Sequence, residues 1–431
     1  MSERNRELLG LIPASLLVTA GFTAVFIERQ DLVTDVSLTY GAIFLGLCLA
    51  VHIFLRLTLP HADPYLFPLV ALLASFGLVM IYRIDVELAR EQAQWFVVGI
   101  ALFALTILFL RDYRVLERYR YLIALASIGL LMLPRVPGLG GGGIGGAYLG
   151  VQVGPINFQP AEFAKIGIVV FVASYLRDTR QVLVMGARRI LGVTLPPLKH
   201  FGPLLVIWGA AMFMLLVIQD LGTALMFFGG FLAVLYVATN RASFVAVGLM
   251  LFAAGAWVVG TQVPRVQDRV EIWRHPFDPE LVNGRAYQIA QSLFAQADGG
   301  LLGQGFGQSQ LSGPGGGTLL PVPHTDLIYS VITNELGLVG GCGVILIYLL
   351  ITERGFKTAT LARDSFSTLL ATGLTAVLAL QVFVIVGGVT KLIPLTGVTL
   401  PFISYGGSSI VANFVLLALL LLVSDRARRP A

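Results

Sequence analysis

The sequence predicts an all-α polytopic membrane protein of about 12 helices, on the basis of its composition and the length of its apolar blocks. Of its 431 residues, 56% are hydrophobic and 12% are charged, and the mean hydropathy is +0.84. A soluble domain carries about 25% charged residues because its surface must face water. Here the apolar blocks are long enough for a helix to cross a bilayer, which takes roughly 20 residues. We therefore expect one membrane bundle rather than several soluble domains.

Each apolar block sets the limits of one expected span. The spans of the first half are placed at residues 8–27, 38–57, 65–82, 92–110, 119–133 and 160–175, of which the fifth is the shortest. The spans of the second half are placed at residues 201–218, 221–239, 243–262, 326–351, 367–386 and 405–424. An even number of spans leaves both termini on the same side of the membrane.

Basic residues gather in the loops on one side of these spans, as at Arg188 and Arg189. The positive-inside rule places this side, with both termini, in the cytoplasm. The same placement accounts for the net charge of +5 without a nucleic-acid partner. The two cysteines, Cys48 and Cys342, lie inside apolar blocks, so they indicate neither a disulfide framework nor a metal site.

The outer loop 263–325 is far longer than an ordinary connection between helices. Within it, residues 287–297 form a polar amphipathic stretch that we expect to lie as a helix on the membrane surface. The glycine-rich run GGLLGQGFGQSQLSGPGGG follows, and the outer loop 134–159 is also glycine-rich. Such loops either carry function or connect flexibly, and the glycine runs alone favour flexible connection.

Charged residues inside spans are informative because a charge at the bilayer centre costs about 2.5–3.5 kcal/mol. Glu162 and Lys165 lie three residues apart, on one face of a helix that has Pro160 in its first turn. They form either a local ion pair that lowers this cost or part of a polar cavity. Asp220 stands at the outer start of another span, where it either caps the helix or joins that cavity.

Asp326 marks the point where the long outer loop returns to the membrane. It either caps the next helix or, beside His324 and Thr325, meets a substrate group at the outer interface. Glu335 follows nine residues later, about 13 Å along a helix axis, and is expected to be neutral or paired. No second ligand accompanies His324 at a helical or short-loop spacing, so hydrogen bonding is favoured over metal binding. No nucleotide-binding signature is present, so no nucleotide cofactor is expected.

Five motifs follow one another along the chain: FQPAEFAK, QDLGTALM, YQIAQS, HTDLIYSVITNELGLVG and IPLTGVTLPFISYGGSS. In these motifs, their order and their spacing, the sequence resembles the SEDS family (shape, elongation, division and sporulation) over about residues 65–424. The resemblance implies a ten-helix bundle that polymerises lipid II into glycan strands in the bacterial cytoplasmic membrane. Residues 1–60 would then be an additional N-terminal pair of helices, and residues 61–431 the family core with its loop 263–325.

The resemblance also implies roles for particular residues. The family's catalytic aspartate falls on Asp326. Residues expected to bind substrate are Arg269, Gln288, Gln291, His324 and Thr325. Residues expected to form the intramembrane polar cluster are Glu162, Lys165 and Asp220, with Glu335 as a further buried carboxylate.

Three departures from the family pattern concern how the outer loop positions the sugar. Leu149 and Gly150 stand where the family commonly has an arginine–tryptophan pair. Val322, followed by Pro323, stands where it usually has a glutamate. The stretch that leads from the glycine-rich run to His324 is also slightly longer. None of these changes affects the aspartate itself.

Glycan growth requires a sugar hydroxyl to attack an anomeric carbon that carries a pyrophosphate leaving group. One general base and cationic help for the leaving group suffice, whereas glycosidases use a carboxylate pair. We therefore expect Asp326 to deprotonate the acceptor 4-hydroxyl, with inversion at the anomeric carbon. Arg269, with Arg265 or Arg274, is expected to contact phosphate, and a divalent cation (Mg or Mn) to bridge its oxygens. Ordinary loop charges are the alternative interpretation of these arginines.

Two other functions remain open from the sequence. A transporter (flippase) of a lipid-linked cell-wall precursor would use Glu162, Lys165 and Asp220 as a polar path, but it needs no elaborate one-sided outer loop. A scaffold for a transpeptidase is compatible with the polymerase, because the resemblance implies pairing with a class B penicillin-binding protein. The resemblance favours a role in elongation over one in division.

Overall fold

The computed structural model describes residues 3–28, 35–136, 150–153, 156–185, 188–190, 193–195, 209, 220–310 and 319–430. In this part of the chain the protein is nearly all helical, which confirms the predicted fold class. The chain divides into two compact units, each described by itself. Unit 1 comprises Met1–Arg111, Ile272–Arg354 and Ile385–Ala431, and unit 2 comprises Asp112–Glu271 and Gly355–Val384.

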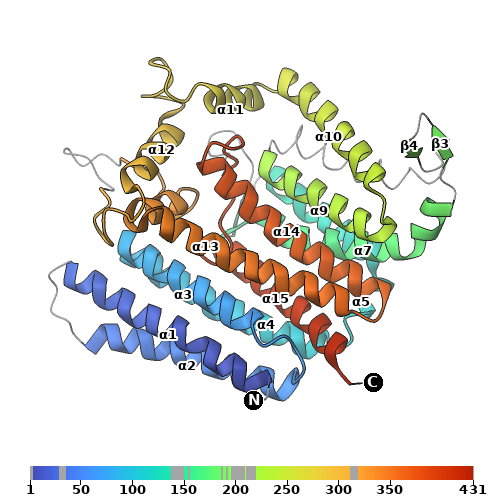
Figure 1. The fold of residues 1–431 in the computed structure, drawn as a ribbon, viewed down its shortest axis with the longest axis horizontal. Helices are drawn as coiled ribbons and strands as arrows, with labels where there is room; N and C mark the ends of the chain where they lie inside the picture. Colours follow the sequence, from blue (N-terminus) through green and yellow to red (C-terminus); the bar gives the residue numbers. More distant parts are fainter. Residues whose placement is uncertain are drawn as a thin grey trace. The chain divides into compact units, whose positions relative to one another are not determined.

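Unit 1 contains long apolar helices and the shorter, more polar α12 (Figure 1). They are α1 (Glu3–Glu28), α2 (Asp35–Thr58), α3 (Leu66–Ile84), α4 (Val86–Phe109), α12 (Tyr287–Gly299), most of α13 (Ile328–Leu361), the end of α14 (Ser365–Val389) and α15 (Gly407–Arg428). Helix α15 lies along α4, and α1 lies against α2 and α3. The ring of Phe414 in α15 meets Phe96 of α4 edge-on, with centroids 5.3 Å apart. Gly99 allows this contact, because a Cβ there would lie 2.7 Å from the Phe414 ring.

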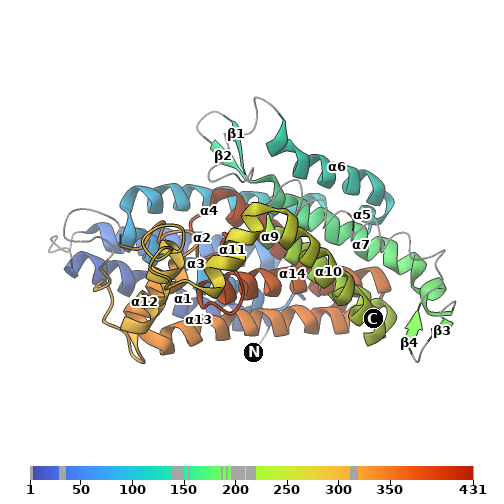
Figure 2. The ribbon, with the colours of Figure 1, turned by 90° about the horizontal axis from the view of Figure 1, so that it is seen from above.

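Unit 2 holds a second group of helices and the strands. Its elements are α5 (Val115–Arg118), α6 (Arg120–Met132), the 3-10 helix η1 (Leu133–Arg135), β1 (Val151–Val153), β2 (Ile156–Phe158), α7 (Pro160–Met185), β3 (Arg188–Ile190), β4 (Val193–Leu195), α9 (Leu221–Thr239), α10 (Ala242–Gln262), and most of α11 (Pro264–Arg274) and α14. Helix α6 lies along α7, α7 packs on α9, and α9 packs on α10 (Figure 2). Ala164, Ala224, Phe227 and Val259 form the apolar core between them.

Nine of the described helices are long and apolar enough to cross a membrane. A helix occupies each predicted span that the structure describes, whereas the predicted span 201–218, apart from residue 209, lies outside the described residues. Helix α4 begins at Val86 rather than at residue 92, because Asp85 caps it. The Asp85 carboxylate accepts hydrogen bonds from the main-chain N–H groups of Glu87 at 2.8 Å and Leu88 at 3.1 Å.

The described parts of the loops 134–159 and 263–325 contain more regular structure than the sequence predicts. Helix α12 confirms a helix at residues 287–297 and extends it to Gly299. Helix α11 was not predicted, although Pro264 at its first position is a signal of a helix start. Strands β1 and β2 form an antiparallel hairpin in which Val151 faces Phe158.

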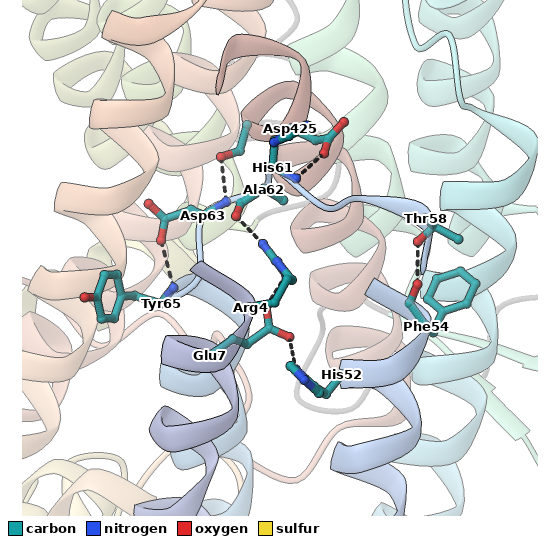
Figure 3. Close-up of polar contacts among 11 residues, drawn as sticks. Arg4, Glu7, His52, Phe54, Thr58, His61, Ala62, Asp63, Tyr65 and Asp425 are labelled. Atoms are coloured by element: carbon teal, nitrogen blue, oxygen red, sulfur yellow. Dashed lines mark hydrogen bonds and ion pairs between the residues drawn. The ribbon is translucent and has the colours of Figure 1, made fainter. Parts of the chain in front are cut away.

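Buried polar side chains join α1 to α2 and to the segment that leads into α3 (Figure 3). Arg4 pairs with Glu7 and donates to the main-chain oxygen of Ala62. Glu7 is fully buried, and its Oε1 lies 2.9 Å from His52 Nδ1 on α2. The positive charge of Arg4 and the negative charge of Glu7 therefore compensate each other inside the bundle.

The segment between α2 and α3 is bound to the end of α15 (Figure 3). The main-chain N–H of His61 donates to Asp425 Oδ1 at 2.9 Å, and that of Asp63 donates to Ser424 Oγ at 3.0 Å. The buried Asp63 carboxylate also pairs with Arg428. These contacts fix residues near both ends of the chain to one another.

Candidate active site

Helix α13 is broken where it meets the glycine-rich run. Gly337 has φ 67° and ψ −170°, which interrupts the helix after Leu336. The run pairs with the interrupted turn through main-chain hydrogen bonds, from Gln304 N to Asn334 O at 2.9 Å and from Gly305 N to Glu335 O at 3.1 Å. A Cβ on Gly303 would lie 2.1 Å from Glu335 O, so only glycine permits this approach. The described part of the run is therefore a packed element of the site rather than a flexible connector.

Glu335 joins the glycine-rich run to α3. Its fully buried carboxylate accepts hydrogen bonds from Gly307 N at 2.9 Å and from Ser309 Oγ at 2.8 Å. Arg83, in the last turn of α3, lies 3.5 Å from the same carboxylate and donates to the main-chain oxygen of Ser309 at 3.3 Å. Glu335 is thus paired and lies near the end of the α3 span.

Asp326 lies on residues 322–327, where the long loop 263–325 leads into α13; we call these residues the return segment. Its side chain is half-buried. The loop between α14 and α15 holds this segment: Ser404 Oγ donates to Thr325 O at 2.7 Å, and Tyr405 N donates to His324 O at 2.8 Å. Gly397, with φ 73°, lies so close that a Cβ there would be 3.4 Å from Asp326 Oδ2. The main chain that carries the Asp326 carboxylate is therefore held in place by the loop between α14 and α15.

Helix α4 supports the same loop. Gln92 Nε2 donates to the main-chain oxygen of Ser404 at 3.2 Å, and its Oε1 accepts from Gly406 N at 3.2 Å. The hydroxyl of Tyr405 donates to Glu91. A half-buried His324 meets the Tyr405 ring edge-on, with centroids 5.6 Å apart. Burial lowers the pKa of His324, and the charge of Asp85 only partly offsets this, so the imidazole is neutral at pH 7.

The return segment carries one strained residue. Val322 has φ 48°, which a β-branched side chain rarely adopts, and its main-chain oxygen accepts a hydrogen bond from Thr325 N at 3.3 Å. Val322 is exposed, and it stands at one of the positions that depart from the family pattern. The second departure from the family pattern is the pair Leu149 and Gly150. Leu149 lies outside the described residues, and Gly150 directly precedes β1 of the β1–β2 hairpin.

In unit 2, Glu162 and Lys165 form a buried ion pair. Lys165 Nζ lies 2.6 Å from Glu162 Oε2 and 2.7 Å from Gln381 Oε1 on α14. The Lys165 side chain is only 1% exposed. Gln381 was not predicted from the sequence to belong to this cluster. An amide side chain within so apolar a helix nevertheless indicates a buried hydrogen-bond partner. The three side chains form a neutral hydrogen-bonded cluster that removes the cost of burying either charge alone.

Asp220 and Arg269 interact in the same unit. Asp220 caps α9, and its Oδ1 accepts from Thr223 N at 3.0 Å. Burial raises the pKa of Asp220, while the hydrogen bonds of Thr223 and the charge of Arg269 act against that rise. Helix α11 carries both Arg265 and Arg269, four residues apart and hence on one face. The charge of Arg269 thus acts on the carboxylate that caps α9.

The glutamines expected to bind substrate lie on α12 in unit 1. Gln288 and Gln291 are both half-buried and three residues apart, so they share one helix face. Ser292 and Gln296 of the same helix make inward contacts: Ser292 and Ser330 share a hydrogen bond of 2.7 Å, and Gln296 donates to Val389 O at 2.8 Å. This packing fixes α12 against the first turns of α13.

The predicted site residues therefore fall into two groups. Unit 1 holds Asp326, His324, Thr325, Gln288, Gln291 and Glu335, and unit 2 holds Glu162, Lys165, Asp220 and Arg269. Reasoning from the sequence missed Ser404, Gln92 and Arg83, which hold the main chain around Asp326 and the glycine-rich run. Ser404 lies within a motif that was recognised, but its hydrogen bond to a main chain 79 residues away has no local sequence signal.

Near the return segment, the described residues offer a divalent cation a single carboxylate, that of Asp326, rather than a set of several protein ligands. Within the described ranges, no group of three or more His, Cys, Asp or Glu side chains is placed to hold a metal. Mg²⁺ is usually bound by one or two carboxylates together with substrate phosphates. The Asp326 carboxylate fits that pattern as a single protein ligand.

Comparison with known proteins identifies the family. A match to the cell cycle protein family of FtsW, RodA and SpoVE covers residues 64–429. The chain belongs to this family. The peptidoglycan glycosyltransferase RodA of Mycobacterium tuberculosis (strain H37Rv) is 40% identical over 440 residues, which cover 100% of this chain and 92% of that protein. The stage V sporulation protein E of Bacillus subtilis is 32% identical over 367 residues, covering 83% and 95%.

Solved structures of the FtsW/RodA/SpoVE family have the same fold. A chain in the structure "Structural coordination of polymerization and crosslinking by a peptidoglycan synthase complex" matches with a TM-score of 0.67 and 28% identity, covering 86% of this chain and 99% of that one. The RodA of Thermus thermophilus matches with a TM-score of 0.59 and 27% identity, covering 86% and 98%. The predicted SEDS resemblance is confirmed, and the chain is an integral membrane protein.

Proposed function

We propose that this chain is a peptidoglycan glycosyltransferase that polymerises lipid II at the outer face of the bacterial cytoplasmic membrane, with both termini in the cytoplasm. One observation carries the proposal. A half-buried carboxylate, Asp326, stands on a return segment whose main chain is held by Ser404 and Tyr405. The names of the relatives support the activity, and the basic loops support the orientation.

In the proposed reaction, Asp326 accepts the proton of the acceptor 4-hydroxyl while the hydroxyl oxygen bonds to the anomeric carbon of the donor. The bond from that carbon to the pyrophosphate oxygen breaks, and the lipid pyrophosphate leaves with the electron pair. Attack from the opposite side inverts the anomeric carbon. No general acid is needed, because pyrophosphate leaves as an anion.

The remaining charged groups assist binding and folding. Arg269 supplies positive charge for phosphate, and a divalent cation (Mg or Mn) brought with the substrate would neutralise the leaving group. Glu162, Lys165 and Gln381 stabilise the helix bundle through their buried hydrogen bonds. A class B penicillin-binding protein is the proposed partner, since the matching solved structure with the higher TM-score comes from a peptidoglycan synthase complex.

The test uses the full chain reconstituted in lipid vesicles with lipid II. We expect Asp326→Asn to abolish polymer formation while the melting temperature stays unchanged. Glu87→Gln, a change at a carboxylate 73% exposed at the start of α4, is the matched control and should polymerise normally. Full-length glycan made by a folded Asp326→Asn protein would refute the assignment.

The same vesicles distinguish the transporter. A flippase would carry labelled lipid II across the bilayer without forming polymer. Polymer formation that depends on Asp326 therefore supports the glycosyltransferase, and translocation without any polymer would overturn it.

A further inference from the structure

A cavity of about 330 Å³ lies in unit 1 beside α13, the helix that follows the return segment. Its walls are α12, the glycine-rich run with Leu319 and Leu320 beyond it, and the first turns of α13. Pockets of roughly 300–1,000 Å³ hold small ligands or parts of larger ones. This volume suits one or two groups of a substrate rather than a whole lipid-linked sugar.

Amide side chains dominate the polar lining of the cavity. Gln291, Gln304, Gln308 and Asn334 all contribute to it. Asn334 Nδ2 donates to Ala295 O at 2.8 Å, which leaves its carbonyl oxygen as an acceptor. The side-chain amides of Gln291 and Gln308 have no hydrogen-bond partner among the residues that the structure describes, so each offers both a donor and an acceptor.

The lining carries almost no charge. Asp298 is the one ionisable side chain among the described lining residues, and none of these is cationic. Pyrophosphate requires cationic or main-chain N–H donors, so it does not suit this cavity. Neutral hydroxyl and acetamido groups do suit it, because amides pair with both. The half-exposed ring of Phe294 adds an apolar surface, as the faces of sugar rings require.

The cavity lies away from the reacting bond. The lining includes Val331 and Asn334, five and eight residues after Asp326, but no described residue of the return segment itself contributes to it. A sugar in the cavity is therefore a different one from the sugar whose bond is made at Asp326.

We propose that this cavity binds an uncharged N-acetylated sugar of the glycan substrate, at a subsite separate from the reacting sugars. The proposal rests on the proposed function. Glu335 and Arg83 maintain the subsite, because Ser309 in its wall donates to Glu335 at 2.8 Å and Arg83 donates to the main chain of Ser309 at 3.3 Å. The subsite thus shares its supporting contacts with the glycine-rich run.

The experiment measures polymerisation kinetics of the full chain in vesicles, with a short oligomer of N-acetylglucosamine as a competing probe. Gln291→Ala combined with Gln308→Ala should raise KM for lipid II about fivefold or more, with kcat nearly unchanged, and should weaken inhibition by the oligomer. Gln181→Ala, at an exposed glutamine of α7 outside the lining, is the matched control. A glucose oligomer of equal length, which lacks acetamido groups, should inhibit less.

The outcomes separate this proposal from the proposed function. If the wild-type protein makes no polymer, the function itself fails. If it polymerises and the double variant matches Gln181→Ala in both KM and inhibition, the subsite is overturned. Equal inhibition by the two oligomers would overturn the acetamido assignment. Melting curves establish that each variant is folded, so a change in KM reports binding.

Discussion

Ser404 Oγ donates a hydrogen bond of 2.7 Å to the main-chain oxygen of Thr325, the residue directly before Asp326. The same hydroxyl oxygen accepts from Leu400 N at 2.9 Å, so one side chain connects two main-chain segments. Ser404 is 3% exposed, and water therefore cannot easily replace either bond. This contact therefore fixes the main chain directly before Asp326.

We predict that Ser404→Ala lowers polymerisation more than it lowers stability. The change leaves a buried carbonyl and a buried N–H without their partner, at a cost of about 1–3 kcal/mol. Much of that cost is relieved if the return segment moves, which displaces Asp326. The measurement is kcat for lipid II polymerisation beside the melting temperature. A kcat reduced about tenfold is expected, and an unchanged kcat would show that the bond does not position the carboxylate.

Gly397→Ala tests the other side of the carboxylate. Gly397 has φ 73°, where an L-residue costs roughly 1–2 kcal/mol, and the new Cβ would lie 3.4 Å from Asp326 Oδ2. We expect polymerisation to fall about tenfold. Gly343→Ala, at a helical position of α13 with no atom within 4 Å of the new Cβ, should leave activity unchanged. Equal activity of the two variants would exclude a close approach of Gly397 to the reacting group.

The sequence predicted the helices well because the limits of each apolar block set the limits of one membrane-spanning helix. It predicted α12 from local amphipathicity, and it placed Asp326 where the outer loop returns. It could not predict the break at Gly337, because that break depends on pairing with Gln304 and Gly305, some thirty residues earlier in the chain. The partner of Glu335 was missed for the same reason, since Arg83 lies on α3 and no local spacing connects the two.

His324 gives the protein a predicted pH dependence. Burial lowers the pKa of the folded-state imidazole below 6.5, so the unfolded state binds a proton first as the pH falls. Stability from this group is therefore fully present above pH 6.5 and declines as the pH drops below it. Melting temperatures between pH 5 and pH 7.5 should fall less in His324→Gln than in the wild type. Parallel curves for the two proteins would contradict the assignment.

Glu335 and Arg83 are predicted to be energetically coupled. Glu335→Gln replaces two acceptor oxygens by one and leaves the Arg83 charge less compensated, so we expect a loss of about 3–5 kcal/mol in unfolding free energy. Arg83→Met alone should also destabilise. Together the two changes should cost clearly less than the sum of the single changes, as a double-mutant cycle of unfolding free energies would show. Additive costs would mean that the 3.5 Å contact carries no coupling.

The N-terminal pair is predicted to depend on Glu7. The family match begins at residue 64, yet the alignment with the mycobacterial RodA also includes α1 and α2, so the pair is not peculiar to this chain. Glu7→Gln removes the charge that compensates Arg4 in a buried site, and the melting temperature should fall by several degrees. Arg6→Ala, at an exposed arginine one residue away, is the matched control and should have no effect. Adding Arg4→Met to Glu7→Gln should restore part of the loss, because no uncompensated charge then stays buried. If the double variant were as unstable as Glu7→Gln alone, charge compensation would not be what holds the pair in place.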